Sequence, residues 1–143
     1  MALLALASAV ALKAQSIVFP NFSSTSGLVL TSVHSTPTTS DGTVVRLVAS
    51  GESSAVGGMF SSSQLNVTTF STAFQFRLTS PAGIDDGTAI GADGFTFTVR
   101  RGANNTLGSS GSGLGYSGIG QSVADEFDTF NNGSADNNSP NHV

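Results

Sequence analysis

The sequence predicts an all-β fold in which antiparallel strands pack as a sandwich or a barrel. Short segments that alternate apolar and polar side chains recur along the 143 residues, and turns rich in Gly, Ser and Asn separate them. Only 10% of the residues are charged, whereas helices usually need more Glu, Lys and Ala. No stretch predicts a helix, and the length favours a single domain.

The segments 70–78 and 94–100 alternate most clearly. Each carries phenylalanines at every second position with Thr, Gln or Arg between them, so the aromatic rings share one face of a strand. Weaker patterns predict further strands at residues 17–19, 28–30, 43–49, 55–60 and 122–127. The polar stretch 31–42 is expected to be a loop.

The N-terminus has the pattern of a secretory signal peptide. An apolar run ends in Ala9-Val10-Ala11, a small-x-small cleavage pattern, and the run is too short to span a bilayer. We expect residues 1–14 to be a signal peptide, incomplete because it lacks a positively charged start; the alternative is a buried apolar segment. The mature domain, from residue 15, would then be secreted or displayed at the cell surface.

Charge and cysteine content exclude several classes of function. The formal net charge is −4 and no basic cluster is present, so nucleic acid is not an expected partner. The absence of cysteine excludes disulfides and thiolate metal sites. We expect no membrane insertion of the mature domain.

Potential metal ligands gather in one stretch near the end of the chain. Glu126 and Asp128 are two residues apart on a predicted strand, so their carboxylates lie on one face and repel each other unless a cation lies between them. Asn132, Asp136 and His142 follow on an expected loop. Oxygen ligands suit Ca²⁺, and carboxylates with one imidazole suit Mn²⁺ or a similar transition ion. The alternative interpretation is a solvated polar turn.

This stretch resembles the metal loop of the L-type (legume-type) lectins, and of bacterial secreted proteins that carry the same domain. In that family a strand of the form Glu-Phe-Asp-Thr-Phe leads into a loop with Asn, Asp and His, at the spacing found here. The resemblance covers nearly all of residues 16–143 and implies a concanavalin A-like antiparallel jelly-roll sandwich. It also implies that residues 15–143 are the N-terminal portion of the domain, truncated at the C-terminus.

The resemblance implies two metal ions. Asp128 would bridge a calcium ion and a transition ion such as Mn²⁺, and Glu126 and His142 would complete the transition-metal site. The calcium site would be completed by Asn132, by Asp136 and by the backbone carbonyl of Phe130. The family often has Pro after the loop Asp, whereas Asn137 stands there in this chain, so Asn137 or Asn138 is an alternative ligand.

Two further motifs match the family's sugar site. In Ala92-Asp93-Gly94-Phe95, Asp93 would follow a cis peptide bond and accept hydrogen bonds from sugar hydroxyls. In the glycine-rich stretch 111–116, the N–H of Ser112 or Gly113 would donate to the sugar. The Asn132 amide would also donate, and the Phe130 ring would stack on the sugar. The alternatives are an Asp-Gly turn for the first motif and a flexible linker for the second.

Three other carboxylates are expected to have no part in this chemistry. Side chains alternate along a strand, so Asp125 shares a face with Val123 and Phe127 and is expected to point toward the core, where an unpaired carboxylate is costly. Either Asp125 is paired, or this strand is looser than in related domains. Asp85 and Asp86 precede Gly87 and are expected to be solvated in a turn.

The implied function is metal-dependent, non-catalytic binding of glycans or glycoconjugates. A single monosaccharide would bind weakly, so several copies, for example in a homo-oligomer, would supply avidity. One alternative is a secreted structural or adhesion module with the same fold. A less favoured one is a jelly-roll glycoside hydrolase, because Phe130 and Asn131 stand where such enzymes carry a second Glu.

Overall fold

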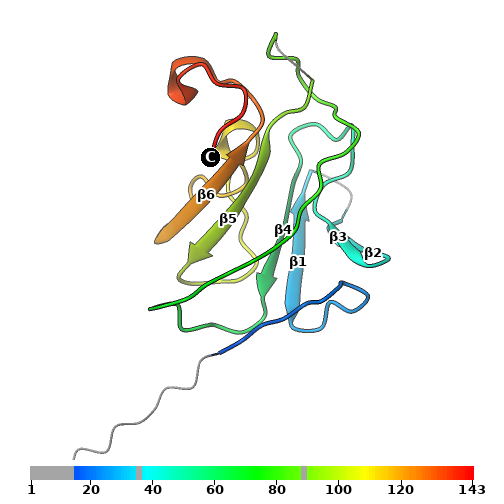
Figure 1. The fold of residues 1–143 in the computed structure, drawn as a ribbon, viewed down its shortest axis with the longest axis vertical. Helices are drawn as coiled ribbons and strands as arrows, with labels where there is room; N and C mark the ends of the chain where they lie inside the picture. Colours follow the sequence, from blue (N-terminus) through cyan, green and yellow to red (C-terminus); the bar gives the residue numbers. More distant parts are fainter. Residues whose placement is uncertain (1–14, 35–36, 88–89) are drawn as a thin grey trace, which may run out of the picture.

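The computed structural model describes residues 15–34, 37–87 and 90–143, and this part of the chain is all-β (Figure 1). The strands are β1 (Leu28–Val33), β2 (Thr39–Asp41), β3 (Val44–Arg46), β4 (Val56–Ser61), β5 (Gly94–Arg100) and β6 (Ser122–Asp128). Two short 3₁₀ helices are η1 (Gly111–Gly113) and η2 (Gly133–Asp136). None of the described helices is long and apolar enough to cross a membrane. The predicted signal peptide lies outside the described residues.

The strands form three antiparallel pairs, β1–β4, β2–β3 and β5–β6. The expectation of a loop over the whole stretch 31–42 was wrong, because β1 runs on to Val33 and β2 lies within that stretch. The three polar residues of β2 are too few to show alternation, so the β2–β3 hairpin was not predicted. Gly42 permits its tight turn with a φ of 64°. β3 is also shorter than the strand expected over residues 43–49.

Phenylalanine rings form the main apolar cluster of the described chain. Phe95 of β5 pairs with Phe127 of β6, and their rings stack with centroids 4.6 Å apart. From the segment that crosses the strands obliquely between β4 and β5 (Figure 1), Phe76 packs on both rings at 4.5 and 5.5 Å. Phe74 stacks on Phe97 at 5.8 Å. The rings that the alternation placed on one face of each segment therefore lie together in one cluster.

Two predicted strands are not formed. Residues 70–78 and 17–19 have no ladder to any described strand, although the Phe74 and Phe76 rings are in place. Alternation reports which face a side chain occupies, whereas a strand also needs a hydrogen-bonding neighbour, which the local pattern does not specify. Phe76 remains 55% exposed on its outer side.

Asp125 does not enter a core. It pairs with Phe97 across the β5–β6 ladder, as parity predicted, but its side chain is exposed. The neighbouring Val123 is 67% exposed, so this end of the aromatic face is open and the carboxylate stays in water. The expected burial penalty therefore does not arise.

The opposite face of β5–β6 carries Glu126 and Asp128, and the glycine-rich loop covers part of it. The Thr96 hydroxyl on this face donates to the carbonyl of Leu114, at 3.4 Å. Leu114 is one of the few buried apolar residues in the described chain, at 8% exposure. Strand alternation thus separates the aromatic cluster from the carboxylates.

Candidate functional site

Asp128 is the buried centre of the site. It ends β6 and is 5% exposed, and its partner across the ladder is Gly94. A Cβ on Gly94 would lie 2.2 Å from the Phe127 carbonyl oxygen, so only glycine allows β5 to approach β6 this closely. The Phe130 N–H donates to Asp128 Oδ1 at 2.8 Å. This hydrogen bond turns the chain out of the strand and leaves Oδ2 for another partner.

Asp136 is held next to Asp128 by the following loop. The Asn132 N–H donates to Asp136 Oδ2 at 2.5 Å, which closes the loop around η2. Asn137 and Asn138 adopt left-handed conformations and are exposed. The structure therefore brings Asp136, the loop ligand that the sequence predicted, to the site.

His142 completes a cluster of three potential ligands. Its backbone exchanges hydrogen bonds with that of Asp128, at 3.1 and 3.3 Å, which returns the chain to the end of β6. His142 Nε2 lies 4.0 Å from Asp128 Oδ2 and 3.9 Å from Asp136 Oδ1. One ligand atom from each of the three residues lies within 4.8 Å of the others. Buried His142 Nδ1 has no hydrogen-bond partner among the described residues.

Glu126 has a different partner. The phenol of Tyr116, from the glycine-rich loop, donates a hydrogen bond to Glu126 Oε1. This hydrogen bond, then burial, and then the negative charge of Glu126 raise the pKa of Tyr116 above its ordinary value of 10.0. Glu126 lies outside the three-residue cluster, so its role as a metal ligand stays a prediction.

Asp93 adjoins the cluster through the backbone. The Ala92–Asp93 peptide bond is cis, as the resemblance implied. The Thr129 N–H donates to the Asp93 carbonyl and the Thr129 hydroxyl to the Gly91 carbonyl, each at 2.7 Å. Burial, and then the negative charge of Asp128, raise the pKa of the Asp93 carboxyl.

The glycine-rich stretch is a folded loop. Its backbone hydrogen bonds include Gly108 N–H to the Gly115 carbonyl, at 2.7 Å, and Ser109 N–H to the Ser117 carbonyl, at 2.9 Å. Around residues 111–116 the chain forms η1 and turns. The Gly113 N–H donates to the backbone carbonyl of Ser110 at 3.2 Å, and Ser112 is exposed. Which of the two N–H groups meets a sugar stays a prediction.

Phe130 and Asn132 are both half-buried on the loop that leaves β6. The Asn132 side chain does not cap η2, which leaves its amide for other partners. Their proposed sugar contacts are not tested by this geometry.

Sequence reasoning missed two contacts of the site, those of Tyr116 and Asp86. Asp86 was expected to be solvated, yet its Oδ2 accepts the Asn131 N–H at 3.0 Å. No local pattern signals a contact between residues 45 positions apart.

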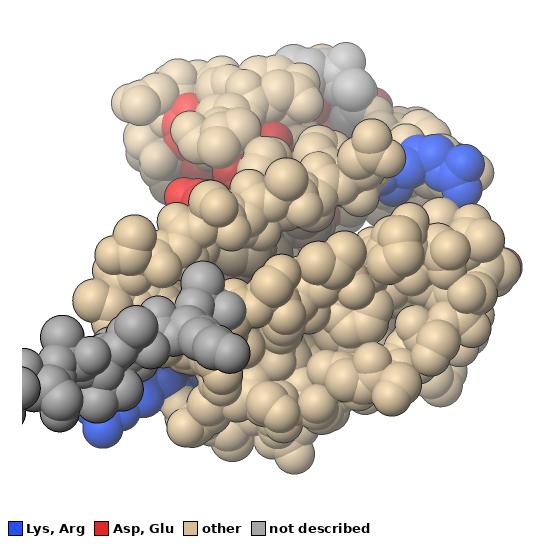
Figure 2. Space-filling view, turned by 60° about the horizontal axis from the view of Figure 1, so that its bottom comes forward, with Lys and Arg blue, Asp and Glu red and all other residues tan. Residues whose placement is uncertain are grey.

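The charge distribution agrees with a cation site. On the face shown in Figure 2, most of the visible acidic side chains gather in one region, and the described Arg side chains that are visible lie apart from them. Because the Asp128 and Asp136 carboxylates adjoin without a Lys or Arg partner among the described ion pairs, a bound cation would relieve their repulsion.

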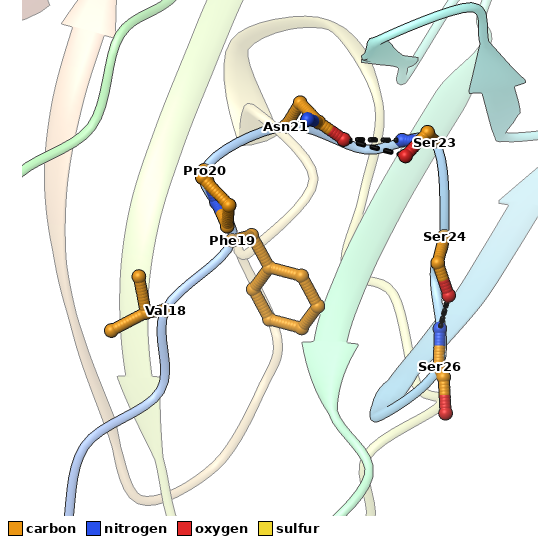
Figure 3. A pocket seen from close by; sticks show the side chains of 7 residues that line it. All are labelled: Val18, Phe19, Pro20, Asn21, Ser23, Ser24 and Ser26. Carbon is orange, nitrogen blue, oxygen red and sulfur yellow. Dashed lines mark hydrogen bonds between the residues drawn. The ribbon is translucent and has the colours of Figure 1, made fainter.

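A hollow near the N-terminal end of the described chain has no comparable ligand set (Figure 3). It is lined by Val18, Phe19, Pro20, Asn21, Ser23, Ser24 and Ser26. Its polar groups satisfy each other locally, since Asn21 Oδ1 accepts from both the N–H and the hydroxyl of Ser23. It is not a candidate for the function.

Comparison with known proteins identifies the family. The model of the legume lectin domain matches residues 14–143, so the chain belongs to this family, and its antiparallel all-β architecture is that of a jelly-roll sandwich. Membership supports carbohydrate binding in general, in a family that is not catalytic. No solved structure matches the chain closely enough for comparison.

Proposed function

We propose that the chain is a Ca²⁺- and Mn²⁺-dependent, non-catalytic carbohydrate-binding domain. The observation that supports this most strongly is the convergence of Asp128, Asp136 and His142, whose ligand atoms lie within 4.8 Å of one another. Thr129, the residue after Asp128, is hydrogen-bonded to the backbone of Asp93. Thr129 therefore links the three potential metal ligands to Asp93, the proposed sugar acceptor.

The donor set fits the implied ions. A buried carboxylate, a half-buried carboxylate and an imidazole with an unpartnered nitrogen suit a divalent cation. Calcium would be held by Asp128, the Phe130 carbonyl, Asn132 and Asp136. A transition ion such as Mn²⁺ would be held by Glu126, Asp128 and His142. The ions would neutralise the carboxylates and fix the loop, which lowers the ordering cost of sugar binding.

The sugar would bind through paired hydrogen bonds. Asp93 would accept from two hydroxyls, while the Asn132 amide and the N–H of Ser112 or Gly113 would donate. The Phe130 ring would cover the C–H face of the sugar. We further propose that the domain acts outside the cell or on its surface, with glycans or glycoconjugates as partners and oligomerisation as the source of avidity.

A glycan array tests the proposal. The wild-type chain, Asp93→Ala and the control Asp125→Ala are applied in Ca²⁺ and Mn²⁺, and again after EDTA. We expect glycan retention by the wild type and Asp125→Ala that EDTA abolishes, and none by Asp93→Ala. Retention that survives EDTA, or no retention by folded, metal-loaded wild type, would contradict the proposal. The second outcome would favour an adhesion module, and release of reducing sugar would favour a hydrolase.

A further inference from the structure

Asp85 and Asp86 are adjacent in sequence, but their carboxylates accept hydrogen bonds from different parts of the chain. Asp85 is exposed, and its Oδ1 accepts the N–H of Gly87 at 2.7 Å within its own turn. Asp86 is half-buried, and its Oδ2 accepts the N–H of Asn131 at 3.0 Å, in the loop that follows β6. Among the contacts of the described residues, only the second carboxylate connects two distant parts of the chain.

The N–H of Asn131 belongs to the same peptide unit as the carbonyl of Phe130. A peptide unit is planar, so its N–H and C=O point in opposite directions and turn together. A carboxylate that fixes the N–H therefore also fixes the direction of the Phe130 carbonyl oxygen. A hydrogen bond to an anionic acceptor also polarises the peptide unit, which makes that oxygen a stronger ligand for a cation.

The loop is held on both sides of this peptide unit. On the N-terminal side, Phe130 N–H donates to Asp128, and Thr129 donates to the carbonyls of Gly91 and Asp93. On the C-terminal side, the Gly133 N–H donates to the side chain of Asn131 at 2.7 Å. The Asp86 contact is the hydrogen bond that acts on the Phe130–Asn131 peptide unit itself.

We propose that Asp86 is a positioning residue for calcium, which holds the Phe130 carbonyl oxygen in the direction that the cation requires. This role rests on the proposed function, in which that oxygen is a calcium ligand. Asp86 need not touch the ion, because it acts through the peptide unit.

Calorimetric titration with Ca²⁺ alone compares four forms of the chain: wild type, Asp86→Ala, Asp86→Asn and Asp85→Ala. Loss of a residue that orients a metal ligand typically weakens metal binding about 10- to 100-fold. We therefore expect Asp86→Ala to bind Ca²⁺ with about 10-fold lower affinity than the wild type. Asp86→Asn should retain most of the affinity, because an amide oxygen accepts the same N–H. Asp85→Ala should bind like the wild type, since among the described residues the carboxylate of Asp85 accepts a hydrogen bond within its own turn and none from the loop after β6.

Hydrogen exchange of the Asn131 amide provides a readout that needs no metal. Exchange should be faster in Asp86→Ala than in Asp85→Ala, while the amides of β5 and β6 keep their protection and so show that the variants are folded. Equal calcium affinity and equal Asn131 exchange in Asp86→Ala and Asp85→Ala would overturn the proposal. Equal losses in Asp86→Asn and Asp86→Ala would also overturn it, because charge alone would then act. Absence of calcium binding by the wild type would overturn the proposed function itself.

Discussion

At the scale of single residues, the site gathers negative charge that no Lys or Arg among the described ion pairs neutralises. Burial and the charge of Asp128 both raise the pKa of Asp93, so the ionised carboxylate that a sugar would need is held at an energetic disadvantage. A cation beside Asp128 would cancel part of that repulsion. Metal binding and the acceptor state of Asp93 are therefore expected to support each other.

Tyr116 allows one contact of the site to be measured directly, because it is the sole tyrosine of a chain without tryptophan. We expect ultraviolet titration of the metal-free wild type to give a phenol pKa above 10.0, and Glu126→Ala to return it toward that value. Since the folded state then binds this proton more tightly, the contribution of Tyr116 to stability falls as the pH rises above 10.0. Identical titration curves for the two forms would show that the phenol and Glu126 are not in contact.

At the scale of structural elements, the site depends on how closely β5 and β6 approach each other. Gly94 lies opposite Asp128, and its backbone has a φ of 137°, a conformation that residues other than glycine rarely adopt. Gly94 also directly follows Asp93, so the ladder sets the distance between the proposed sugar acceptor and the three potential metal ligands. Backbone packing at one glycine therefore supports both parts of the site.

Gly94→Ala should destabilise the chain by about 3 kcal/mol, the upper end of the usual range for single substitutions. The new methyl group would lie 2.2 Å from the Phe127 carbonyl oxygen, in addition to the unfavourable φ. Gly120→Ala is the matched control, because its Cβ would meet nothing within 4 Å. Urea denaturation measures the stability of the two variants. Equal denaturation midpoints for Gly94→Ala and Gly120→Ala would show that the approach of β5 to β6 does not need glycine.

The elements that the sequence predicted well are those specified by neighbouring residues. Alternation placed the Phe95 and Phe127 rings on one face and the Asp128 carboxylate on the other. The structure also brings Asp136 and His142, which the multi-residue motif named, next to Asp128, while their role as metal ligands stays a prediction. Contacts between distant residues could not be predicted, because no local pattern records them. The partner of Asp86 is one example, and the missing ladder of residues 70–78 is another.

At the scale of the whole molecule, the described chain has little buried core. Val56 and Leu114 are its buried large apolar residues, while side chains such as Phe74 and Leu78 are 45% and 57% exposed. Apolar burial is the main source of folding free energy, so the described contacts provide limited stability. Bound cations that join β6 to the loop would therefore contribute a large share of the total. A ligand at 100 times its Kd adds about 2.7 kcal/mol.

The central claim is that Asp128, Asp136 and His142 supply ligands to two cations, with Asp128 bridging them. Its most direct test is calorimetric titration of Ca²⁺ and of Mn²⁺ into the chain and into Asp128→Asn. We expect both ions to bind the wild type and neither to bind the variant with comparable affinity, because Asp128 is the proposed bridging ligand. Equal affinities in the two forms, or no binding of either ion to the folded wild type, would contradict the account.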